Sequence, residues 1–130
     1  MSKHLELRDG TIPDRLVVVR LGKNTLNENA LANACERSFA RWSVYAFSVL
    51  EVPNGDFERL ARLIPEFSQR RQFLEADGPA LLAAGFPLLP TLKHPHWSVV
   101  LSEPTQSQFQ RVASHFRGPF DNPLWVGRKG

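Results

Sequence analysis

The chain has 130 residues, of which 42% are hydrophobic and 22% charged, and it contains one cysteine, Cys35. That size and balance are ordinary for one globular domain, and they exclude a collagen-like, a disulfide-rich or a wholly disordered protein. The 12 Arg and 4 Lys residues outnumber the 13 acidic residues and give a formal net charge of +3, which is compatible with an anionic partner. No apolar run approaches the ~20 residues of a membrane span, and the first ten residues lack the apolar core of a secretion signal. We therefore expect no membrane association and a cytoplasmic location.

The first expected elements are a strand over 15–21 and a helix over 24–41. Three consecutive valines without polar alternation indicate a strand buried on both faces, in the middle of a sheet. In the helix, apolar residues recur at spacings of three and four, which is typical of one buried face. That face includes Leu31, Cys35 and Phe39.

The rest of the pattern predicts a mixture of short helices and strands. In chain order these are a strand over 44–52, a turn over 53–56, a helix over 57–64, a short helix over 79–84, an edge strand over 86–92, a strand over 96–101 and a last helix over 104–118. Residues 66–75 fit either a helical turn or a loop. Phe109, Val112 and Phe116 form the expected apolar face of the last helix.

These elements predict an α+β fold, in which a small, mainly antiparallel sheet packs against helices as a single pair of layers. A compact α/β sheet is the alternative. We expect residues 1–14 to be a flexible lead, 15–118 to be the single domain and 119–130 to be a Pro/Gly-rich tail.

Lys93, His94 and His96 stand at the head of the strand over 96–101. Because histidine titrates near neutral pH, the pair can act as general acid and base on a phosphodiester while Lys93 stabilises the developing charge. His96-Trp97-Ser98 also resembles one half of the motif of the two-histidine phosphoesterases, which implies a small metal-independent nuclease or phosphoesterase, such as a toxin-like RNase. Pro95 interrupts regular strand geometry between the histidines, so we expect no metal site there. We also expect no cofactor.

Four arginines, Arg59, Arg62, Arg70 and Arg71, lie within thirteen positions. Arginine binds phosphate through a planar fork of donors, and nearby aromatic rings can stack on bases. This run predicts an accessory or regulatory domain that binds an anionic partner, and nucleic acid is the partner we expect. The catalytic interpretation of the histidines is the first alternative. A protein-interaction module that uses Leu124 and Trp125 in the tail is a further alternative, since a tryptophan in a Pro/Gly segment is often an anchor.

Overall fold

The computed structural model describes residues 15–127, and within that range the chain forms four helices, two 3₁₀ turns and six strands. The expected flexible lead over 1–14 lies outside the described residues. In chain order the elements are β1 (Val17–Leu21), α1 (Glu28–Trp42), β2 (Tyr45–Glu51), the 3₁₀ turn η1 (Pro53–Gly55), α2 (Phe57–Leu63), the 3₁₀ turn η2 (Pro65–Gln69), β3 (Gln72–Asp77), α3 (Gly78–Ala83), β4 (Leu88–Leu89), β5 (His96–Leu101), α4 (Gln106–Ala113) and β6 (Phe116–Asp121).

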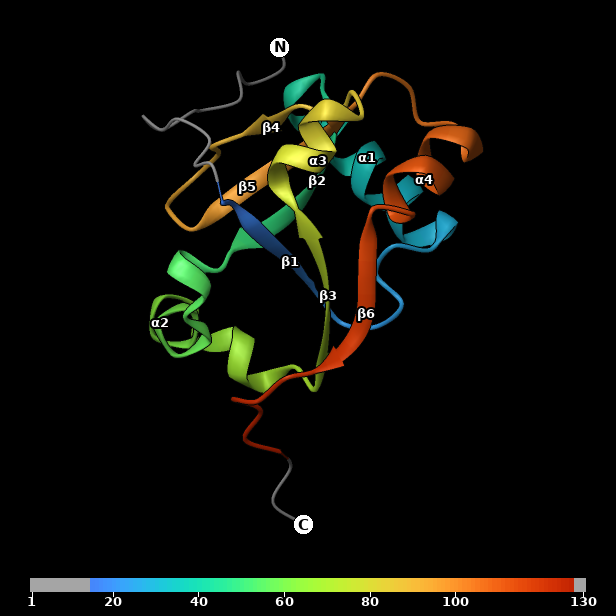
Figure 1. Cartoon of the computed structure of the whole chain (residues 1–130). Coiled ribbons are helices and arrows are strands. Elements are labelled where there is room, and N and C mark those ends of the chain that lie inside the picture. The colour runs from blue at the N-terminus through green and yellow to red at the C-terminus, as the bar shows by residue number, and fades with distance from the viewer. Residues whose placement is uncertain (1–14, 128–130) are drawn as a thin grey trace.

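The six strands form one sheet in the order β4-β5-β2-β1-β3-β6, and every neighbouring pair is antiparallel (Figure 1). The predicted α+β class with a mainly antiparallel sheet is confirmed. β1 lies inside the sheet between β2 and β3, as its unbroken run of valines predicts. The short β4, which follows Pro87 and precedes Pro90, is an edge strand. Proline has no backbone N–H to donate to a ladder, so it is tolerated mainly at the edge of a sheet.

Each face of the sheet carries its own apolar cluster. Val18 packs in the larger cluster with residues of α1, α3 and α4, whereas Val19 packs in a smaller cluster with residues of α2 and η2. Consecutive strand residues point to opposite faces, so α2 and η2 cover the face away from α1 and α4. Figure 1 shows α2 on the other side of β1 and β3 from α1 and α4.

Each helix begins at a residue whose side-chain oxygen accepts the backbone N–H three positions further on. These residues are Asn27, Asp56, Asp77 and Thr105. Such N-caps satisfy a donor that has no partner inside the helix, which is why short helices such as α2 and α3 begin where they do. Among the described residues the longest helix, α1, has 15 residues, and none of the helices is long and apolar enough to cross a bilayer.

Two parts of the sequence fold differently from the expected elements. Residues 66–75, for which the sequence predicts either a helical turn or a loop, contain most of η2 and the start of β3. β3 is an inner strand of the sheet. The last helix ends at Ala113 rather than near 118, and β6 then runs across the position where the tail was expected to begin. Phe116 packs against the larger cluster as expected, but from a strand that pairs with Ala76 rather than from a helix.

Val18, Leu31 and Cys35 are buried, as the sequence predicts, and Phe47 of β2 and Val99 of β5 are buried as well. Burial raises the pKa of the Cys35 thiol, although the charge of Arg20 opposes that shift. Phe39 is different: its side chain is 43% exposed and stacks on Tyr45, with ring centroids 4.5 Å apart. The prediction that Phe39 is core was wrong, because the buried face of α1 is narrower than the apolar stripe in the sequence.

Candidate nucleic-acid interface

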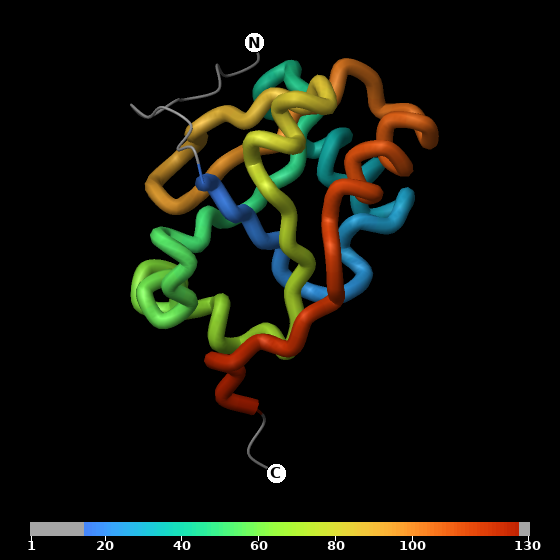
Figure 2. The backbone as a smooth tube through the Cα atoms, viewed as in Figure 1, coloured from blue at the N-terminus to red at the C-terminus, as the bar shows by residue number. Residues whose placement is uncertain are grey.

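The C-terminal segment after β6 is fastened to the turn η2. The Asn122 side-chain amide donates from Nδ2 to the backbone oxygens of Phe67 (2.7 Å) and Arg70 (2.9 Å), and its Oδ1 accepts the Leu124 N–H (2.9 Å). The Val126 N–H donates to the Ser68 oxygen at 3.1 Å. Figure 2 shows the final red segment running beside the light-green segment that contains η2. Two segments more than fifty positions apart therefore form one surface.

Trp125 completes this surface. Its indole is 43% exposed, and the Arg71 guanidinium carbon lies 5.5 Å from the ring centroid, within the range of a cation–π contact. Leu124, in contrast, is half-buried against the smaller apolar cluster, which contains residues of α2 and η2, and it holds the segment in place. We call Arg71 and Trp125 the arginine–tryptophan surface. The sequence predicted the arginine run and the tryptophan as separate candidates, and the fold brings one arginine of that run, Arg71, into contact with Trp125.

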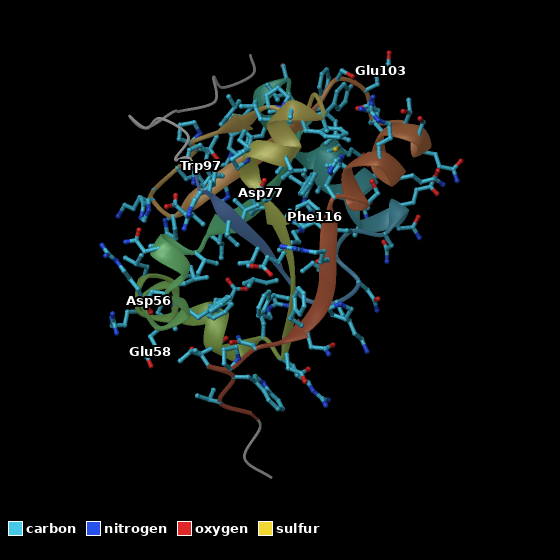
Figure 3. The ribbon with its side chains drawn as sticks, viewed as in Figure 1. Asp56, Glu58, Asp77, Trp97, Glu103 and Phe116 are labelled. Atoms are coloured by element: carbon cyan, nitrogen blue, oxygen red, sulfur yellow. The ribbon has the colours of Figure 1, made fainter. Side chains whose placement is uncertain are left out.

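The other arginines of the run lie close by in the chain and are exposed. Arg59 and Arg62 are exposed on α2, which packs against η2. Acidic residues accompany them: Asp56 and Glu58 lie together at the outer side of α2 (Figure 3). Arg70 makes an ion pair with Glu66, with Nη2 and Oε1 3.0 Å apart, and both side chains are about half exposed. Exposed pairs of this kind contribute little to stability, so a phosphate can replace the carboxylate at small cost.

The two histidines predicted to act together at the start of β5 contact different residues. The exposed His94 places Nε2 3.6 Å from Oε2 of Glu51, whose Oε1 accepts a hydrogen bond from Trp97 Nε1 at 2.9 Å. The half-buried His96 places Nδ1 2.8 Å from the Thr91 hydroxyl. Each histidine is thus oriented by a different neighbour, and the exposed Lys93 lies in the turn before them. Within residues 15–127 no three His, Cys, Asp or Glu side chains are arranged to hold a metal ion.

Of these predicted catalytic residues, His96 lines a hollow together with an arginine of the predicted run. That hollow has a volume of about 470 Å³, and its lining also includes Arg20, Arg70 and Glu66. His115, the other described histidine, lies far along the chain and packs edge-on against Phe86. The arrangement therefore brings His96 near guanidinium groups that could bind a phosphate.

Sequence reasoning missed Asn122, the residue on which the arginine–tryptophan surface depends. Asn122 is 7% exposed, and its amide satisfies backbone groups from two segments. The only local signal is the Asn122-Pro123 pair, which is typical of a turn and says nothing about η2. Comparisons of the chain with protein-family models, with curated proteins and with solved structures find no match.

Proposed function

We propose that the chain is a small cytoplasmic accessory or regulatory domain that binds an anionic partner, and that this partner is single-stranded nucleic acid. The observation that carries the proposal is the contact between Arg71 and the exposed indole of Trp125. A cation beside an exposed ring matches the two needs of a single strand, a charge for the phosphate and a platform for the base. Arg59, Arg62 and Arg70 extend the positive charge along α2 and η2.

Removing the four arginines should weaken binding and flatten its dependence on salt. The variant replaces Arg59, Arg62, Arg70 and Arg71 with Gln, and fluorescence anisotropy measures its affinity for an unstructured RNA and a single-stranded DNA at several salt concentrations. Each lost phosphate contact should lower the slope of log affinity against log salt by about 0.7. Trp125→Ala should instead weaken binding by about fivefold or more with the slope unchanged, because stacking releases no counterions.

A matched control replaces four exposed cations elsewhere, Arg15, Lys23, Lys93 and Arg117, with Gln. This variant loses the same charge, so we expect it to keep most of the affinity. If both quadruple variants lose affinity equally, general charge rather than this surface is responsible. If the parent binds neither nucleic acid, the proposal fails. Trp125 then remains the candidate anchor for a protein partner.

The hydrolytic alternative is favoured by one observation, the presence of His96 in a hollow with Arg20 and Arg70. If the domain cleaves phosphodiesters, His96→Ala should lower turnover of RNA or of a cyclic phosphodiester by about a hundredfold, as expected for loss of a general acid or base. His94→Ala serves as the control, because His94 contacts Glu51 instead. Rates at several pH values check this prediction, and a parent no faster than the uncatalysed reaction would remove the alternative.

A further inference from the structure

The sheet separates between β1 and β2, and Arg20 lies in the gap. Pairing of the two strands ends at Val19 and Leu50. Beyond that point the Arg20 guanidinium donates from Nη1 to the Ser48 backbone oxygen at 2.7 Å, and from Nε to the Thr25 oxygen at 3.4 Å. Both acceptors are neutral carbonyls, so the contacts orient the guanidinium without neutralising its charge.

Helix α1 brings two more arginines to the same place. Arg20, Arg37 and Arg41 all line a hollow of about 230 Å³, and no Asp or Glu is among its lining residues. Arg37 and Arg41 are four positions apart on the helix, a spacing at which like charges destabilise each other. Among residues 15–127, the ion pairs involve Glu66 and Glu51, and neither includes any of these three arginines.

This arrangement disfavours the charged form of Arg20. Burial, and then the charge of Arg37, lowers the pKa of Arg20 below its ordinary value. Arg41 has a structural reason for its position, because it stacks on Trp42 with 4.7 Å between guanidinium carbon and ring centroid and lies in the last turn of α1, where the helix dipole favours a cation. Neither reason applies to Arg37. A bound anion would relieve the repulsion among all three charges.

A second hollow adjoins the first and has a different character. It is the hollow of about 470 Å³ that contains His96, and it shares Arg20 and Ser48 with the smaller one. Much of its lining is apolar: Val19, Leu21, Val49, Leu50 and Ile64. A ligand whose anionic group occupies the smaller hollow could therefore bury an apolar portion in the larger one.

We propose that Arg20, Arg37 and Arg41 bind the phosphate or carboxylate group of a small organic ligand, whose apolar portion lies in the hollow lined by Leu21, Leu50 and Ile64. This site includes neither Arg71 nor Trp125 and does not depend on nucleic-acid binding, although Arg70, which is part of the nucleic-acid proposal, also lines the larger hollow. Phosphate and carboxylate share the chemistry that an arginine fork recognises, so the experiment has to distinguish them.

The test measures thermal unfolding and calorimetric binding with inorganic phosphate, phenyl phosphate and benzoate, each against sodium chloride at the same ionic strength. We expect phenyl phosphate or benzoate to raise the Tm of the parent, and the better of the two identifies the head group. Arg37→Gln should bind that probe at least about tenfold more weakly, since it loses charge-assisted hydrogen bonds. Arg37 is exposed, so the variant should fold like the parent.

Arg117→Gln is the matched control, because Arg117 is an exposed arginine on β6 that lines neither hollow. It should bind the probe as the parent does. Equal affinity for the probe in Arg37→Gln and the parent, or no response to any probe beyond that to chloride, would overturn the site. Equal affinity for phosphate and phenyl phosphate would overturn the placement of an apolar portion. RNA affinity should be unchanged in Arg37→Gln, so failure of this site and failure of the nucleic-acid surface are distinguishable.

Discussion

Phe67→Ala should lower the free energy of unfolding by about 3–5 kcal/mol, the usual cost of removing a fully packed aromatic ring. Phe67 is 0% exposed, and its ring lies 6.0 Å from that of Phe57 and 5.9 Å from that of Phe73, measured between centroids. Its backbone oxygen also accepts a hydrogen bond from Asn122. The ring therefore supports the smaller apolar cluster, while the backbone of the same residue supports the base of the arginine–tryptophan surface.

Phe39→Ala provides the comparison for this prediction, because it removes the same ring from a more exposed position. Phe39 is 43% exposed and has one stacked neighbour, Tyr45, so its loss should cost about 1–2 kcal/mol. Urea denaturation followed by circular dichroism measures both values under the same conditions. A loss for Phe39→Ala as large as that for Phe67→Ala would contradict the different burial of the two rings.

Asn122→Ala should destabilise the domain by about 2–4 kcal/mol, because two backbone oxygens and one N–H lose their partner at once. The Phe67 oxygen is the most costly of these, since its bond to Asn122 is buried. The same variant should release the segment that carries Trp125, so its RNA affinity should fall toward that of Trp125→Ala. Urea denaturation and anisotropy test the two effects separately.

Asn33→Ala supplies the control for Asn122→Ala, because Asn33 is an exposed asparagine on α1. The same chemical change there should leave stability within about 0.5 kcal/mol of the parent. If Asn122→Ala proves equally mild, the amide does not fasten the C-terminal segment to η2, and the arginine–tryptophan surface loses its support.

Most of the regular elements could be predicted from sequence, because their signals are local. The valine run of β1, the helical spacing in α1 and the N-cap Asp56 before α2 each specify their own conformation. β3 could not be predicted, since Phe73 and Leu74 are adjacent and both buried, one on each face of the sheet. That pattern has no alternation, and only the pairing with β1 on one side and β6 on the other makes it a strand.

The candidate sites depended still more on contacts between distant segments. The sequence identified the arginine run and Trp125, but their contact results from Asn122, which binds backbone fifty-five positions away. Arg20 lies near the end of β1. Because β1 separates early from β2, the Arg20 side chain turns toward Ser48 and lines a hollow with residues of α1.

The strand order also has a consequence for how the chain folds. Among the strands that the structure describes, β1 with β2 and β4 with β5 are the pairs that follow one another in the chain. The pairs β1 with β3, β2 with β5 and β3 with β6 join segments tens of residues apart, as in Val18 with Ala76 and Phe47 with Val99. Each such pairing must close a long loop before its hydrogen bonds and burial contribute any stability, so its entropic cost comes first. The domain should accordingly cross its folding barrier far more slowly than a helical bundle of the same length, on the order of milliseconds to seconds.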